Sequence, residues 1–178
     1  AKHVLSLSAS FDFSRLLAIA RRNSVLPFLY KSMESSKVVP EETVNSLRQA
    51  YLATAASNIV NAEETVRMLE LLRIAGVEAI TLKGSIASEL VFGDPGLYLA
   101  SDIDILVKPS DLEKAKVVLV KEGYAYSESA ERDLLSSHYH LVLNRKGHYV
   151  ELHWNLSKRY FKVPPEFWWE DTQIAQYN

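Results

Sequence analysis

Hydrophobic residues recur every three or four positions up to about residue 76, which is the spacing of α-helices. We expect a first helix over residues 11–22 and a short second helix from Ser24. A long third helix should open with Pro40 and stop at Gly76, because proline is favoured at helix starts and glycine just past helix ends. Its apolar stripe consists of Val44, Leu47, Tyr51, Ala55, Ile59, Ala62, Val66, Leu69 and Leu72. Such a stripe is typical of core packing or of a seam with a partner helix, and we assign it no chemical role.

From Val77 the pattern changes to short strands that alternate with helices. Strands are expected over residues 77–82 and 103–107, and helices over residues 84–92 and 110–122. Further strand-like segments lie near Tyr124, at 138–143 and at 148–154, with a hairpin turn at 145–147. This order favours an α+β fold, in which a mixed β-sheet has helices packed on one face and follows an N-terminal helical segment.

The chain therefore divides into three parts in our prediction. Residues 1–76 form the helical N-terminal segment, and residues 77–160 form the α+β domain. Residues 161–178 form a C-terminal extension that is compatible with truncation of a longer protein. With 178 residues, 48% of them hydrophobic, the chain is long enough to bury a real core.

Composition excludes only a few classes of protein. A formal net charge of −2 gives no global attraction to nucleic acid, although clustered Lys and Arg can still contact phosphates locally. The absence of cysteine excludes disulfides and thiolate zinc sites. No uncharged run approaches the ~18–20 residues of a membrane span, and the N-terminus lacks a signal-peptide pattern. We therefore expect a cytoplasmic protein that does not act in the membrane.

Two aspartates provide the first candidate chemistry. Asp102 and Asp104 stand two positions apart on a predicted strand, so both side chains point to one face, while Ile103 and Ile105 point to the other. Adjacent ionised carboxylates repel each other, and a divalent cation such as Mg²⁺ would supply the missing positive charge. The alternative is a strand whose polar face is simply in solvent, which is the usual meaning of an isolated Asp-x-Asp.

A second candidate element is Lys83-Gly84-Ser85, at the junction of a predicted strand and a predicted helix. Gly84 would let a phosphate approach the backbone, Ser85 adds a hydroxyl donor, and a helix N-terminus offers free N–H groups. Lys83 would add a cation. Gly-Ser at such a junction is also ordinary capping chemistry, so its meaning depends on the Asp-x-Asp that follows.

Glu151 is the third candidate element. In the segment 149–154 the alternation of a strand puts Tyr149, Glu151 and His153 on one face, and the apolar residues between them on the other. If this strand lies beside the Asp-x-Asp strand, Glu151 completes a cluster of three carboxylates. The alternative is an exposed glutamate on an edge strand.

The ordered set of Lys83-Gly84-Ser85, Ser101-Asp102-Ile103-Asp104 and Val150-Glu151-Leu152-His153-Trp154 resembles the DNA polymerase β-like nucleotidyltransferase superfamily. Within it, the chain is most similar to the uncharacterised prokaryotic nucleotidyltransferases with Leu-Lys-Gly, Asp-Ile-Asp and Glu-Leu-His-Trp blocks. The resemblance covers roughly residues 40–157. It departs from the family pattern in two places, since sixteen residues separate Ser85 from Asp102 and Tyr98 stands near the place of a common arginine.

The resemblance implies transfer of a nucleoside monophosphate from an NTP, such as ATP, to an acceptor hydroxyl, with release of pyrophosphate. It implies that Lys83, Gly84 and Ser85 bind the nucleotide and that Asp102, Asp104 and Glu151 hold Mg²⁺ or Mn²⁺ and carry the catalysis. The acceptor stays open among a small molecule, a protein and RNA. Two rival functions also stay open, namely another Mg²⁺-dependent Asp-x-Asp transferase and a catalytically degenerate domain that binds nucleotide or protein.

Three histidines are accessory candidates. His138 and His140 alternate onto one face of their predicted strand, and His153 is expected near them across the hairpin. Three histidines are compatible with a zinc site. Beside a phosphate site, histidine more often donates hydrogen bonds or transfers protons, and we favour that interpretation.

Overall fold

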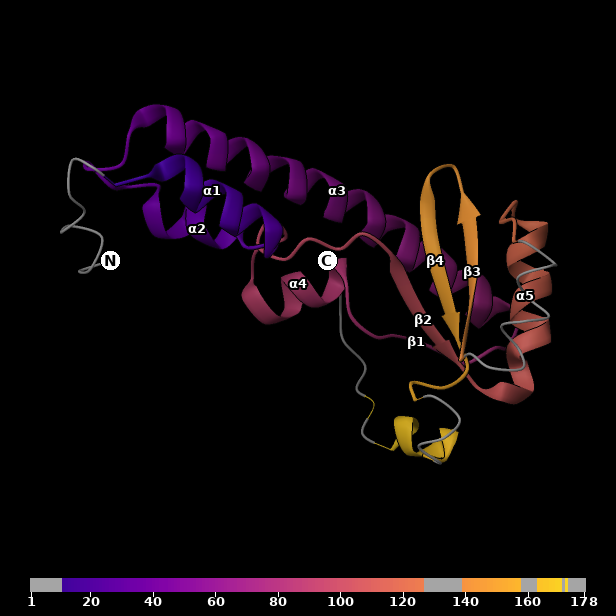
Figure 1. Cartoon of the computed structure of the whole chain (residues 1–178). Coiled ribbons are helices and arrows are strands. Elements are labelled where there is room, and N and C mark those ends of the chain that lie inside the picture. Colours follow the sequence, from indigo (N-terminus) through magenta and orange to yellow (C-terminus); the bar gives the residue numbers. More distant parts are fainter. Residues whose placement is uncertain (1–10, 127–138, 158–162, 171, 173–178) are drawn as a thin grey trace.

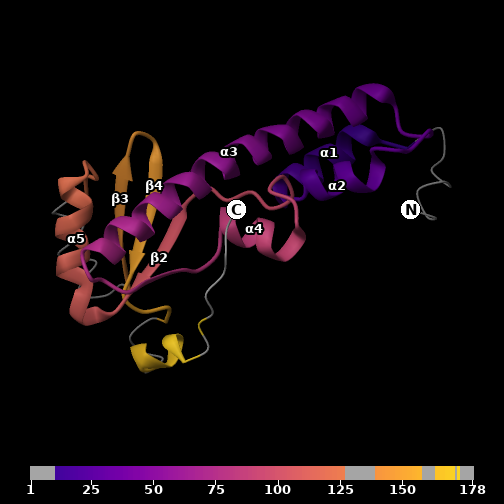
Figure 2. The same cartoon turned by 180° about the vertical axis from the view of Figure 1, so that it is seen from behind.

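The protein is elongated, with a helical half at one end and a β-sheet at the other (Figure 1). A computed structural model describes residues 11–126, 139–157, 163–170 and 172. The long helix α3 (Glu41–Ile74) runs from the helical half to the sheet and contacts both (Figures 1 and 2). This architecture confirms the predicted α+β fold with a helical N-terminal part.

Helices α1 (Phe13–Arg22) and α2 (Leu26–Met33) pack together, and α2 lies against the first part of α3. Helix α1 begins after Asp12, whose carboxylate accepts a hydrogen bond from the Arg15 N–H, as N-cap side chains do. These helices share a small apolar core that is separate from the core under the sheet, and its buried residues are Met33, Val39 and Leu47.

The sheet has four strands in the order β1-β2-β4-β3. Strand β1 (Ala79–Thr81) is antiparallel to β2 (Ile103–Val107), which is parallel to β4 (His148–His153). Strand β3 (His140–Arg145) pairs with β4 as a hairpin, and its turn residues Lys146 and Gly147 both have positive φ, the conformation of a type I′ turn. The strands at 103–107 and 148–153 and the hairpin turn agree with the prediction.

One face of the sheet is covered by α3 and by α5 (Leu112–Lys121), which follows the short 3₁₀ turn η2 (Pro109–Asp111). The core on this face contains Met68, Leu72, Ile103, Ile105, Val107, Ala115, Leu119, Val150 and Leu152. Because residues alternate along a strand, Asp104, Glu151 and His153 belong to the opposite face. Burying the apolar face under two helices thus leaves the polar face available for chemistry.

Two predictions about the strands need correction. The segment near Tyr124 is not a strand in the described part of the chain, because it joins the sheet only through a bridge between Ala125 and Asn144. Tyr124 is instead a buried core residue. The strand predicted from residue 138 begins at His140 in the structure, and His138 lies outside the described residues.

The predicted apolar stripe of α3 is wrong in the middle of the helix. Ile59 and Val66 are 47% and 43% exposed, whereas Asn58 is 1% exposed and Thr54 and Thr65 are also buried. The reason is that this part of α3 faces the backbone of the segment 93–101, whose polar groups need hydrogen-bond partners rather than apolar contact.

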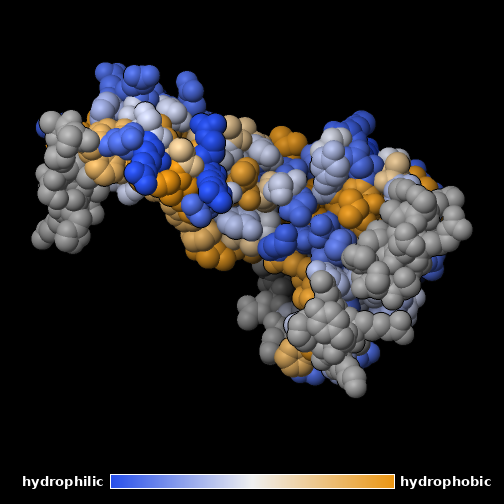
Figure 3. Space-filling view, in the orientation of Figure 1, coloured by the Kyte–Doolittle hydropathy of each residue, from blue (hydrophilic) through white to orange (hydrophobic). Residues whose placement is uncertain are grey.

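Helix α4 (Ser85–Phe92) lies between the two halves and ends at Gly93, which adopts the left-handed conformation that glycine favours. Apolar side chains lie exposed around α4 and α2, where the rings of Phe28 and Phe92 meet edge to face with 5.4 Å between their centroids (Figure 3).

Within the described ranges, no helix combines the length and the apolar character that crossing a membrane requires.

Candidate active site

Three carboxylates converge on the polar face of the sheet. Asp104 and Glu151 are direct neighbours across the parallel strands β2 and β4, and Asp102 stands just before β2. One oxygen atom of each carboxylate lies within 4.8 Å of an oxygen of the other two. The Asp104 side chain is 0% exposed, while those of Asp102 and Glu151 are each 28% exposed. The structure therefore brings together the three acids that the sequence singled out.

The Lys83 ammonium group lies between two of these acids. Its Nζ atom is 2.9 Å from Asp104 Oδ2 and 3.5 Å from Asp102 Oδ2. The Lys83 ammonium is thus the partner of Asp104 Oδ2 in a short ion pair. The ion pair supplies positive charge to a carboxylate that is cut off from water.

His153 holds the other oxygen of the same aspartate. Its Nε2 atom lies 3.1 Å from Asp104 Oδ1 and 3.3 Å from Glu151 Oε2, and its ring stacks on Tyr139 with 5.9 Å between centroids. Burial is the strongest single influence on the pKa of Asp104 and raises it. The hydrogen bond from His153 and the charge of Lys83 together outweigh burial, so the pKa of Asp104 lies below its ordinary value.

His140 lies at the outer side of this cluster. Its Nε2 atom is 3.9 Å from Glu151 Oε1, and its ring centroid is 5.1 Å from that of His153, its cross-strand partner. His140, Glu151 and His153 form a second group with metal-ligand spacing that shares Glu151 with the carboxylate cluster. The third predicted histidine, His138, is outside the described residues.

The start of α4, where the motif Lys83-Gly84-Ser85 lies, adjoins the carboxylates. Gly84 is the N-cap residue and has φ +99° and ψ −149°, a conformation in which L side chains are strained. A Cβ atom at this position would lie 3.6 Å from the carbonyl oxygen of Asp102, which is an ordinary contact. The conformation, rather than a lack of space, therefore requires glycine here.

The long segment between Ser85 and Asp102 is held by α3. The buried amide of Asn58 donates to the carbonyl oxygens of Pro95 and Tyr98 and accepts a hydrogen bond from the Ala100 N–H. These bonds fix the backbone that leads directly into Ser101 and Asp102. Asn58 is thus a positioning residue that the sequence analysis missed, because a search for apolar periodicity gives no weight to a buried amide.

Further contacts from α3 hold the same segment. Asn61 donates to the carbonyl oxygen of Ala100, and the hydroxyl of Tyr51 donates to the carboxylate of Asp94. A Cβ atom on Gly96 would lie 2.3 Å from the ring of Tyr51, so no side chain fits at this position without a shift of the segment. The extra residues between the two motifs are accommodated by this packing against α3.

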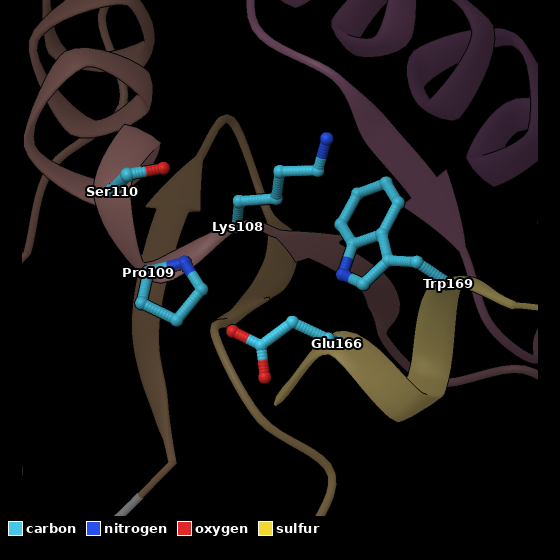
Figure 4. Close-up of a pocket in the computed structure, with 5 residues that line it drawn as sticks. All are labelled: Lys108, Pro109, Ser110, Glu166 and Trp169. Atoms are coloured by element: carbon cyan, nitrogen blue, oxygen red, sulfur yellow. The ribbon is translucent and has the colours of Figure 1, made fainter. Parts of the chain in front are cut away.

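A pocket of about 280 Å³ lies beyond the C-terminal end of β2 rather than at the carboxylates. Its walls are Lys108, Pro109, Ser110, Glu166 and Trp169 (Figure 4). The Lys108 ammonium lies 5.2 Å from the centroid of the Trp169 ring, a cation–π contact, and it also pairs with Glu78. The side chains of Lys108 and Trp169 are therefore held in place by protein contacts, and we assign this pocket no ligand.

The residues of the carboxylate cluster fit a hard divalent cation. Its donors are carboxylate oxygens, which such ions prefer; they lie within 4.8 Å of one another, and the Asp104 carboxylate among them is fully buried. A cation would neutralise the repulsion among three acids that lie this close together.

Comparison with known families agrees with this class of site. A family described as uncharacterised nucleotidyltransferase matches residues 9–178, and the chain belongs to this family. No curated protein and no solved structure matched the chain. Membership supports nucleotidyl transfer as the general chemistry and implies an NTP as a substrate.

Proposed function

We propose that the protein transfers a nucleoside monophosphate from an NTP to an acceptor hydroxyl and releases pyrophosphate. The observation that carries this proposal is the convergence of Asp102, Asp104 and Glu151 beside the N-terminus of α4 in a member of a nucleotidyltransferase family. A phosphoryl centre needs both features, because its charge must be neutralised and its oxygens must be held in line for displacement.

In this proposal the triphosphate binds at the start of α4. Lys83, Gly84 and Ser85 supply a cation, an approachable backbone and a hydroxyl, and the first turn of the helix supplies unpaired N–H groups. Asp102, Asp104 and Glu151 hold Mg²⁺ or Mn²⁺, which when bound supplies positive charge to the phosphate oxygens and orients the displacement. The buried Asp104 is kept ionised for this task by Lys83 and His153.

We assign Glu151 a second role on the acceptor side. Its carboxylate is partly exposed, unlike that of Asp104, so it can meet an incoming hydroxyl and help to remove its proton. His140 and His153 contact Glu151 from two sides and keep its carboxylate oriented. The acceptor is a small molecule, a protein or an RNA that offers a hydroxyl group.

The experiment uses NTPs that carry radiolabel on the α-phosphate. Each is incubated with the full chain, Mg²⁺ or Mn²⁺, and a fractionated cell extract, and label is followed into products other than the NTP. We expect the α-label of one or more NTPs to appear in an acceptor product, whereas the γ-label of the same NTP should appear in pyrophosphate and not in that product. That pair distinguishes nucleotidyl transfer from phosphoryl transfer.

Two variants provide the controls. Asp102→Asn/Asp104→Asn should abolish transfer, because two of the three charges that hold the cation are removed. Asp111→Asn, on the turn after β2 and outside the cluster, should leave it unchanged. If no α-label moves and NTP binding does not depend on the metal, the proposal is wrong.

A further inference from the structure

We propose that Lys83 acts as a built-in counter-cation of the metal site, and that its move from the aspartates to the nucleotide phosphates makes metal and nucleotide bind as a linked pair. This inference rests on the proposed function, because it concerns how the same site is loaded. It is carried by the two contacts of Lys83 Nζ, at 2.9 Å from Asp104 Oδ2 and 3.5 Å from Asp102 Oδ2.

The ammonium group and a divalent cation need the same oxygens. A cation held by both aspartates would lie between their carboxylates, where Lys83 Nζ lies in this structure. Two positive groups that share a pair of oxygens at these distances repel each other strongly, because the site is shielded from water around Asp104. One of the two must therefore leave when the other binds.

In the pair of Lys83 and Asp104, Lys83 is the more mobile partner. The Asp104 side chain is 0% exposed, stands in the middle of β2, and is held at its second oxygen by His153. The Lys83 side chain is 55% exposed and has a long flexible stem. Its backbone directly precedes Gly84, the N-cap of α4, so the ammonium can turn toward an anion bound at that helix start.

These positions couple the two ligands. A metal ion that binds alone must break the ion pair, and all three carboxylates of the cluster, Glu151 included, are then occupied by the metal ion. A metal ion that binds together with a triphosphate displaces the ammonium onto phosphate oxygens, so the positive charge is compensated in both places. Such coupling is reciprocal, since whatever the nucleotide adds to metal affinity the metal adds to nucleotide affinity.

Removal of the ammonium should therefore shift the two affinities in opposite directions. In Lys83→Met, which keeps most of the apolar stem, Mn²⁺ alone should bind about fivefold or more tightly than in the unchanged protein, the lower end of typical coupling. A non-hydrolysable NTP analogue should bind more weakly. A residue that merely stabilised the fold would weaken both.

The test measures Mn²⁺ binding to the full chain by electron paramagnetic resonance of the free ion, without nucleotide. Binding of an α,β-methylene ATP analogue is then measured by calorimetry, with and without Mn²⁺. Lys83→Ala serves as a second variant, and thermal unfolding verifies that each variant is folded. Lys108→Ala removes a lysine that pairs with Glu78 outside the cluster, and it should change neither affinity.

Tighter Mn²⁺ binding together with weaker analogue binding in both Lys83 variants supports the inference. Unchanged or weaker Mn²⁺ binding in the folded variants overturns it. The proposed function is tested separately by the α-label assay. Normal transfer with unchanged Mn²⁺ affinity in Lys83→Met would reject the exchange alone, whereas linked binding without any transfer would reject the enzymatic function alone.

Discussion

Glu151 is the direct neighbour of Asp104 across two parallel strands that lie far apart in the sequence. This pairing places a partly exposed carboxylate beside a buried one, and His153 contacts both. The difference in exposure fits a division of work, in which Asp104 stays fixed and Glu151 meets the acceptor.

Glu151→Gln tests that division. The amide keeps the size of the side chain and removes its charge, so we expect the rate of nucleotidyl transfer to fall by about 100-fold or more, the equivalent of several kcal/mol of lost charge stabilisation. Without metal, binding of the NTP analogue should change little, because the triphosphate is held at α4 and Glu151 acts on it only through the metal ion. Single-turnover rates and calorimetry measure the two effects. A variant that loses analogue binding but keeps its rate would contradict the division.

Gly84→Ala tests the start of α4. Alanine at φ +99° and ψ −149° should destabilise the fold by roughly 1–3 kcal/mol and weaken analogue binding. Gly147→Ala is a matched control, since Gly147 also has a positive φ of +90° but lies in the β3–β4 turn with open space around it. It should lose similar stability in urea unfolding and keep its affinity for the analogue. Equal loss of affinity in both variants would contradict a nucleotide site at Gly84.

Asn58→Leu tests the positioning of Asp102 from α3. The change leaves the Pro95 and Tyr98 carbonyl oxygens and the Ala100 N–H without their partner, so we expect a loss of about 1–3 kcal/mol in stability. Mn²⁺ affinity should fall as well, because this backbone leads into Asp102. Ile59→Ser, on the neighbouring exposed position, should affect neither quantity. If Asn58→Leu is folded and its Mn²⁺ affinity is unchanged, the segment 93–101 does not position Asp102 for metal binding.

A buried charge cluster at the end of α3 predicts how stability depends on pH. Glu64 accepts hydrogen bonds from Arg67, Tyr124 and Arg145, and the Arg67 bond is the main reason that its pKa is lowered to about 2. A carboxyl with a lowered pKa in the folded state stabilises the fold above its unfolded pKa. This contribution, about 3 kcal/mol, should be lost as the pH falls from about 4.5 toward about 2.

Urea unfolding at several pH values measures this loss. The Glu64→Gln variant should have a lower free energy of unfolding than the unchanged protein at pH 6. This difference should shrink as the pH falls below about 4.5. Glu70→Gln is the control, because Glu70 pairs with Arg73 at the same spacing but on the exposed surface. A constant difference between Glu64→Gln and the unchanged protein across the acid range would contradict the assignment.

The sheet could be predicted from sequence because alternation and turn residues are local signals. The strand at Ile103–Val107, the hairpin turn at Lys146 and Gly147, and the shared face of Glu151 and His153 all follow from neighbours in the chain. The proximity of Glu151 to Asp104 required the strand order, which the sequence analysis stated only as a condition.

The contribution of α3 could not be predicted in the same way. Asn58 is buried because it bonds a segment about forty residues away, and only the tertiary structure shows that segment beside the helix. Ile59 follows the apolar spacing and is nevertheless exposed. The motif predicts a nucleotide-binding role for Lys83, but its ion pairs with the aspartates depend on tertiary structure, in which the preceding Leu82 N–H donates to the Asp104 carbonyl oxygen of β2. The division of the chain at residues 76 and 160 stays a prediction.

The most direct test of the metal site is a crystal of the full chain grown with Mn²⁺ and the α,β-methylene ATP analogue, measured near the manganese absorption edge. We predict an anomalous peak within bonding distance of Asp102, Asp104 and Glu151, with the triphosphate at the start of α4. An ordered triphosphate elsewhere, or a peak held by His140 and His153 without the aspartates, would contradict it.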